Sequence, residues 1–145
     1  MLRRRMPSPS SHAGRVACGA LLCALAACSS ESRPETCATF DAGCEELYAP
    51  TYEEIYRRTF APTCARSGVS CHGPGRAGGV VFADRDAAYD RLLSRGLVRP
   101  GDPQCSELAA RIGSDDPLYR MPPGRALDPG ERCAIQKWIA AGAPR

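Results

Sequence analysis

Residues 128–142 read DPGERCAIQKWIAAG and predict the most clearly marked helix of the chain. Asp128 is placed to cap the helix, Pro129 suits its first position, and Glu131 three residues on completes a capping box. Gly142 is placed to end it. We therefore expect an amphipathic helix whose apolar face is formed by Ile135, Trp138 and Ile139.

Similar signals upstream predict further helices. Thr51 opens a capping box, and Pro62 is expected to end the helix that follows. Asp84 is placed to cap a second helix that stops at Gly96, and a short helix ends at Gly113. No alternation typical of strands competes, so we expect a small all-α domain of four or five short helices with long loops. Its apolar helix positions are Tyr52, Ile55, Tyr56, Phe60, Leu92, Leu93, Leu108, Ala109 and Ile112.

The N-terminus resembles a bacterial lipoprotein leader. Four arginines precede an apolar stretch that is shorter than the roughly 20 residues needed to span a bilayer. The stretch ends in Leu25-Ala26-Ala27-Cys28, a lipobox-like sequence, and a Ser/Glu-rich tether follows. We expect a signal peptide at residues 1–27 and lipidation of Cys28, with Ser29 favouring the outer membrane. Several acyl chains would anchor the protein stably to the membrane of the cell envelope.

Removal of residues 1–27 from the 145-residue chain leaves one small domain on a tether. We expect a tether at residues 28–50 and a domain at 51–145. The leader carries four of the 19 Lys and Arg residues and no acids, so 15 basic residues face 16 acidic ones in the mature chain. No basic surface typical of nucleic-acid binding remains.

Six cysteines besides Cys28 survive in an oxidising compartment, and six cysteines allow 15 pairings. A local disulfide between Cys37 and Cys44 is the simplest prediction for the tether. Cys105 and Cys133 would then form a second bridge between the short helix and the last one. The two remaining cysteines are Cys64 and Cys71.

Cys71 is followed directly by His72, the single histidine of the mature chain, and Met121 opens a Met-Pro-Pro-Gly run about 50 residues later. A Cys-His pair can hold a haem through sulfur while the imidazole binds one face of the iron. A blue-copper site is disfavoured because it needs two histidines. Zinc held by Cys64, Cys71 and His72 would lack a fourth ligand.

From Tyr52 to Pro144 the chain resembles the class I cytochrome c-like domains of bacterial envelope proteins. The order and spacing of several short pieces carry the resemblance. In sequence order they are Cys71-His72-Gly73, Gly78-Gly79-Val80, the run Val98–Pro103, Ser106-Glu107-Leu108, Met121-Pro122-Pro123-Gly124 and the run Trp138–Pro144.

The resemblance implies a haem c with His72 and Met121 as axial ligands, and one-electron transfer to a redox protein partner rather than enzymatic catalysis. It also implies covalent attachment through Cys64 and Cys71. The spacing departs from the family, however, since Cys64 and Cys71 form C-x6-C-H in place of C-x-x-C-H. The residues between the two cysteines would have to loop out for both to reach one haem.

A second interpretation stays open. Cys64 and Cys71 could form a disulfide, as the equal separation of Cys37 and Cys44 suggests. The chain would then be a haem-free lipoprotein of the same fold, stabilised by disulfides and acting as a binding or structural module.

Overall fold

A computed structural model describes residues 37–65, 72–73 and 79–145 of the chain. The chain divides into two units, residues 1–31 and 32–145, and every described residue belongs to the second unit. The predicted signal peptide, the lipidation site Cys28 and the haem-attachment candidate Cys71 lie outside the described residues.

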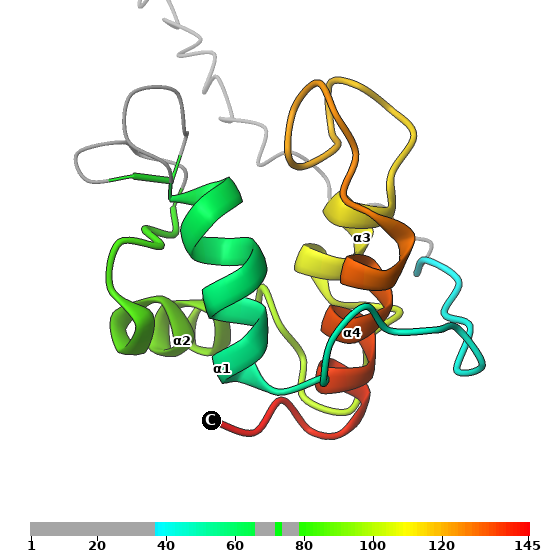
Figure 1. The fold of residues 1–145 in the computed structure, drawn as a ribbon, viewed down its shortest axis with the longest axis horizontal. Coiled ribbons are helices and arrows are strands. Elements are labelled where there is room, and N and C mark those ends of the chain that lie inside the picture. Colours follow the sequence, from blue (N-terminus) through cyan, green and yellow to red (C-terminus); the bar gives the residue numbers. More distant parts are fainter. Residues whose placement is uncertain (1–36, 66–71, 74–78) are drawn as a thin grey trace, which may run out of the picture. The chain divides into compact units, whose positions relative to one another are not determined.

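The described residues form helices and no strand, so the all-α prediction is confirmed. Figure 1 shows α1 running into a second helical segment, followed along the chain by three further helices. The elements in chain order are α1 (Tyr52–Ile55), the π-helix η1 (Tyr56–Cys64), α2 (Arg85–Ser94), α3 (Glu107–Gly113) and α4 (Pro129–Ala140). No helix in the described part of the chain is long and apolar enough to cross a membrane.

The predicted ends of α4 are confirmed. The Asp128 side chain accepts a hydrogen bond from the Gly130 amide, and Glu131 accepts one from the Asp128 amide. At the other end Gly142 has φ +93°, and the amide of Ala143 donates to the carbonyl of Trp138. This is the arrangement in which a left-handed residue ends a helix, which glycine adopts at low cost.

The expectation that Pro62 ends the first helix is wrong. The helix continues to Cys64 with wide turns, in which the amide of Ala65 donates to the carbonyl of Phe60 five residues earlier. In a regular α-helix the Pro62 ring would clash with the carbonyl four residues before it. The wider spacing of the π-helix accommodates the proline, so the helix continues for two residues beyond it and ends at Cys64.

The core forms where α1 and η1 pack against α4. The rings of Tyr52 and Trp138 have centroids 5.5 Å apart, and both side chains are buried. The Trp138 indole donates to the carbonyl of Pro144 at 2.8 Å, so its polar atom is satisfied within the core. Other fully buried residues around this contact are Ile55, Phe60, Leu92, Val98, Ile135 and Ile139.

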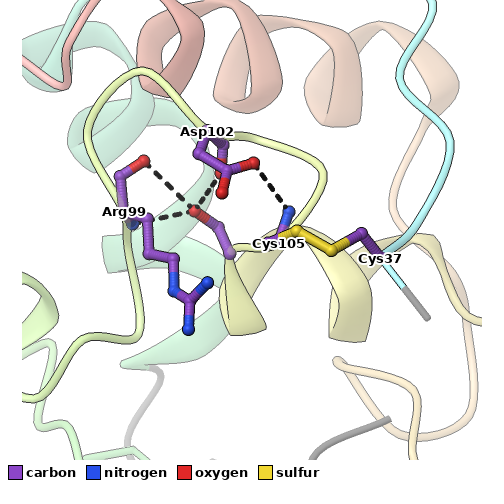
Figure 2. Close-up of a disulfide and its surroundings, with 5 residues drawn as sticks. Cys37, Arg99, Asp102 and Cys105 are labelled. Atoms are coloured by element: carbon purple, nitrogen blue, oxygen red, sulfur yellow. Dashed lines mark hydrogen bonds between the residues drawn. A yellow bond between two sulfur atoms is a disulfide. The ribbon is translucent and has the colours of Figure 1, made fainter. Parts of the chain in front are cut away.

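The predicted disulfide pairs Cys37–Cys44 and Cys105–Cys133 are wrong. Cys37 is joined to Cys105 and Cys44 to Cys133, across sequence separations of 68 and 89 residues. Figure 2 shows the first bridge beside the turn that leads into α3, where the Cys105 amide donates to the Asp102 carboxylate at 3.0 Å. The equal spacing of two cysteine pairs was therefore a misleading guide to connectivity.

The physical reason is that residues 37–48 run along the starts of α3 and α4. The Ala38 amide donates to the carbonyl of Gln104 at 2.9 Å, and the Leu47 amide donates to that of Gly130 at 3.1 Å. A Cβ added at Gly130 would lie 2.9 Å from the Leu47 amide nitrogen, so only glycine permits this approach. Residues 37–48, which lie within the predicted tether, are thus fixed to two helices.

Candidate functional site

His72 is held in place by hydrogen bonds to Val80 and Phe82. Its Nδ1 atom lies 2.9 Å from the carbonyl oxygen of Val80, and its own carbonyl accepts a hydrogen bond from the Phe82 amide at 2.9 Å. A carbonyl can only accept, so Nδ1 carries the proton. In the neutral ring Nε2 then keeps its lone pair and is the nitrogen that could bind a metal.

Aromatic rings flank the imidazole. The His72 and Phe82 rings meet edge to face with centroids 5.5 Å apart, and Phe82 packs on Phe60 of η1 at 4.6 Å. The Tyr56 hydroxyl donates to the Phe82 carbonyl at 2.9 Å, which fixes the same segment from the helix. The half-buried imidazole therefore lies beside an apolar wall of aromatic rings.

Cys64 ends η1 with a free thiol. It is half-buried and packs against the core, and burial, with a smaller effect of the Glu131 carboxylate, raises its thiol pKa to about 12. A disulfide at Cys64 was one of the two interpretations left open by the sequence, and the structure has a free thiol there instead. Cys71, the other half of that pair, lies outside the described residues.

A buried hydrogen-bond chain ties η1 to the first turn of α4. The hydroxyl of Thr59, which is fully buried, donates to the Glu131 carboxylate at 2.8 Å and lies 2.5 Å from the hydroxyl of Tyr48. Glu131 thus serves the capping box and this chain together. Sequence reasoning assigned Glu131 only to the cap and missed Thr59, whose signal was a polar residue on the apolar face of the first helix.

Met121 is held by the last turn of α3. Its amide donates to the carbonyl of Arg111 at 3.0 Å, and the Met121–Pro122 peptide bond is cis. The Arg111 guanidinium donates to Glu107 at 2.7 Å and lies over the Tyr119 ring, while the Tyr119 hydroxyl donates to Glu107 at 3.0 Å. The loop that carries Met121 is therefore braced against α3.

The side chain of Arg120 bridges the loop on the other side of Met121. Its Nη2 atom donates to the carbonyl of Gly124 at 2.5 Å, and its backbone amide donates to the carbonyl of Asp116 at 2.7 Å. The Nε atom of Arg120 is buried without a hydrogen-bond partner among the described residues. Such an unsatisfied buried donor is rare in folded proteins.

The two candidate iron ligands are thus held by different parts of the fold. His72 is fixed by the segment after it, and Met121 by α3. Cys64 lies on η1, near the start of α4. No cluster of three or more His, Cys, Asp or Glu side chains suited to a bare metal ion occurs in the described ranges.

These residues fit a haem better than a bare ion. A ligating histidine ordinarily donates its other ring nitrogen to a carbonyl or carboxylate, as His72 does to Val80. The edge of an apolar aromatic cluster suits a porphyrin, and a thioether is a ligand that haem iron accepts. The buried Nε–H of Arg120, which has no partner among the described residues, could donate to an oxygen of the carboxylates that a haem carries.

Comparison with known families points in the same direction. Residues 69–125 match the family model described as Planctomycete cytochrome C. The matched stretch contains Cys71, His72 and Met121, and it supports a cytochrome c-like domain, a class that binds haem and transfers electrons. No curated protein and no solved structure matches the chain.

Proposed function

We propose that the mature chain is a lipid-anchored electron carrier of the bacterial cell envelope that binds one haem c with His72 and Met121 as axial ligands. The family match supports the coarser part of this proposal, a haem-binding electron-transfer domain. The ligand set, the covalent attachment and the anchor are the finer parts, each with its own test.

The hydrogen bond from His72 Nδ1 to the Val80 carbonyl carries the proposal. It selects the tautomer in which Nε2 can donate its lone pair to iron, and the second bond, from the Phe82 amide to the His72 carbonyl, limits movement of the residue.

Three further residues would hold the haem, each by a different bond. Cys71 would form the thioether next to the proximal ligand, and the free thiol of Cys64 is available for a second one. Met121 would present its thioether sulfur from the braced loop. When bound, the haem supplies a one-electron Fe(III)/Fe(II) couple, and a His/Met pair favours a high reduction potential. Burial among Phe60 and Phe82 would keep water from the iron.

The location follows from the leader and is also a proposal. Lipidation at Cys28 would hold the domain at the outer membrane, within reach of a redox protein partner. The chain acts as a carrier and not as an enzyme, since electron transfer through a six-coordinate iron needs neither a bound substrate nor a general base.

A haem-free lipoprotein of the same fold is the competing function. The two disulfides would stabilise the fold without a cofactor, which is the observation in its favour. That interpretation also uses a Cys64–Cys71 disulfide; Cys64 is a free thiol in the structure, and Cys71 lies outside the described residues.

Absorption spectroscopy decides between the two functions. The full chain is expressed in a host with a cytochrome c maturation system, and we expect a Soret band with sharp α and β bands on reduction, retained through acid–acetone extraction. His72→Ala should lose the low-spin spectrum while Cys28→Ser keeps it. Colourless protein with both native disulfides intact would support the haem-free function.

Membrane anchoring is tested separately. We expect radiolabelled palmitate to be incorporated into the wild-type chain and not into Cys28→Ser, and the wild type to fractionate with the outer membrane. Equal labelling of both proteins, or a soluble wild type, would overturn the anchor while leaving the haem assignment to its own test.

A further inference from the structure

Residues 37–48 form a strap that two disulfides hold against α3 and α4. The second of these bridges, Cys44–Cys133, lies next to the buried hydrogen-bond chain described above. Cys44 precedes Tyr48 by four residues in the sequence. Cys133 follows Glu131 by two residues and is buried. The bridge therefore fixes the strand of the strap at one end of the hydrogen-bond chain to the helix at its other end.

The free thiol of Cys64 lies beside the same chain. Thr59 and Cys64 are five residues apart in η1, which is the spacing of hydrogen bonds in a π-helix, so their side chains lie on the same side of it. Burial raises the pKa of the Cys64 thiol, and the Glu131 carboxylate raises it further. Burial also raises the pKa of Tyr48, to which Glu131 and Cys64 both contribute. Tyr48, Glu131 and the thiol are therefore neighbours.

Tyr48 is the side chain by which the strap covers this region. It is 7% exposed, whereas its neighbour Leu47 is 61% exposed, and its hydroxyl lies 2.5 Å from that of the buried Thr59. Without the nearby bridge, this part of the strap would keep the hydrogen bond from the Leu47 amide and an ion pair between Glu46 and Lys137. Ion pairs that solvent reaches contribute little to stability. The position of Tyr48 therefore depends on the bridge.

We infer that the Cys44–Cys133 bridge is a redox-sensitive clasp that controls access to the Cys64 thiol. While the bridge is closed, Tyr48 stays packed on η1 and the thiol is shielded. A dithiol that reduces the bridge breaks the S–S bond, leaves two thiols on the chain and becomes a disulfide itself, so that electrons and protons balance. The strap then detaches with Tyr48 and exposes Cys64. Because haem attachment is assigned to Cys64 only by the proposed function, control of that attachment by the clasp rests on the proposed function.

The rate at which Cys64 is alkylated in the haem-free, folded chain tests the clasp. The parent protein carries Cys71→Ser, so that Cys64 has no partner at that position, and peptide mass spectrometry follows its modification by iodoacetamide at pH 8. We expect Cys44→Ser/Cys133→Ser in this background to react at least about tenfold faster than the parent, because the thiolate forms more readily once it is solvated. The parent should show the same increase after reduction with dithiothreitol and removal of the reductant.

The other disulfide of the strap supplies the matched control. Cys37→Ser/Cys105→Ser removes one bridge from the same strap, but Cys37 is eleven residues before Tyr48. Its Cys64 should therefore react at close to the parent rate. Equal rates in the two bridge variants, with circular dichroism showing both to be folded, would overturn the clasp.

A second pair of variants keeps both bridges and decides the matter if a bridge variant does not fold. Tyr48→Ala removes the covering side chain, and Leu47→Ala removes an exposed one from the adjacent position. Cys64 should react faster in Tyr48→Ala, and equal rates would overturn the clasp. A wild-type chain without haem bands after expression in a cytochrome c maturation host would overturn the proposed function instead, since the alkylation rates do not depend on haem.

Discussion

The Nδ1 atom of His72 lies 2.9 Å from the carbonyl oxygen of Val80, eight residues further along the chain. This contact decides which nitrogen of the imidazole is left to bind a metal. The Phe82 ring packs against the same imidazole and against Phe60 of η1. The imidazole is therefore in direct contact with the core through Phe82. We expect a substitution in the core to alter the position of the His72 ring.

Phe82→Ala should lower the free energy of unfolding by about 3–5 kcal/mol, because a buried ring would be replaced by a cavity between His72 and Phe60. Urea denaturation followed by circular dichroism measures the change. Val81→Ala is the matched control. Because Val81 is 39% exposed, this substitution should lower the free energy of unfolding far less. Equal losses for the two variants would contradict the packing described here.

Met121→Ala should abolish the low-spin His/Met spectrum of the haem-loaded protein and lower its reduction potential, because a thioether ligand favours Fe(II). Leu118→Ala is the control from the same loop, with a side chain that is 94% exposed, and it should leave the spectrum unchanged. An unaltered spectrum in Met121→Ala would remove Met121 from its proposed role.

Cys64 should resist alkylation in haem-free, folded protein. The thiolate is the reactive form, and burial raises the thiol pKa from its ordinary value to about 12. Iodoacetamide at pH 8 should therefore modify folded Cys64 at least about tenfold more slowly than urea-unfolded protein, with a rate that rises with pH. Peptide mass spectrometry follows the modification, and equal rates in the two states would contradict the burial of the thiol.

The same shift has a consequence for stability. Because burial raises the pKa of Cys64 in the folded state above the ordinary value of a cysteine thiol, the folded state favours the protonated thiol. The contribution of the protonated thiol to the free energy of unfolding is complete below about pH 9 and is lost as the pH rises toward 12. Haem-free Cys64→Ser should therefore lose less stability than the unsubstituted chain between pH 8 and pH 10, as measured by urea denaturation at each pH.

Non-reducing peptide maps should show Cys37 joined to Cys105 and Cys44 joined to Cys133. Replacement of either pair by serines should lower the free energy of unfolding by about 2–5 kcal/mol, since each bridge closes a long loop. Recovery of a Cys37–Cys44 peptide as the main species would contradict the path of residues 37–48 along α3 and α4.

Thr59→Val should lower the free energy of unfolding by roughly 1–3 kcal/mol, because the substitution removes the hydroxyl that is hydrogen-bonded to the Tyr48 hydroxyl and the Glu131 carboxylate. Thr63→Val, at an exposed position of the same helix, is the control and should be close to neutral. Thermal unfolding compares the two, and similar melting temperatures would show that the buried chain is not important for stability.

The sequence was a good guide where local chemistry decides the structure. Asp128 and Glu131 predicted the start of α4, and Asp84 caps α2 by accepting from the Ala87 amide as expected. These features depend on residues two or three positions apart. A capping side chain and the amide it binds are therefore both visible in one short window of sequence.

The sequence was a poor guide where distant segments decide the structure. Pro62 predicted a helix end, but packing of Phe60 in the core carries the helix on as a π-helix. The disulfides depend on how residues 37–48 lie against α3 and α4, which the spacing of the cysteines does not reveal. The hydrogen bonds of Met121 to Arg111 and of Thr59 to Glu131 were missed because each joins segments that are distant in the sequence.

The central claim, a haem held at Cys71 and His72, is tested most directly by peptide mass spectrometry of reduced protein from a cytochrome c maturation host. Trypsin cuts after Arg58, Arg66 and Arg76, so Cys64 and Cys71 fall in separate peptides. The account predicts a peptide containing Cys71 that carries the mass of haem and absorbs in the Soret region, joined through the same haem to the peptide containing Cys64 if both thioethers form. Two unmodified peptides after reduction, from protein with both native disulfides, would contradict it.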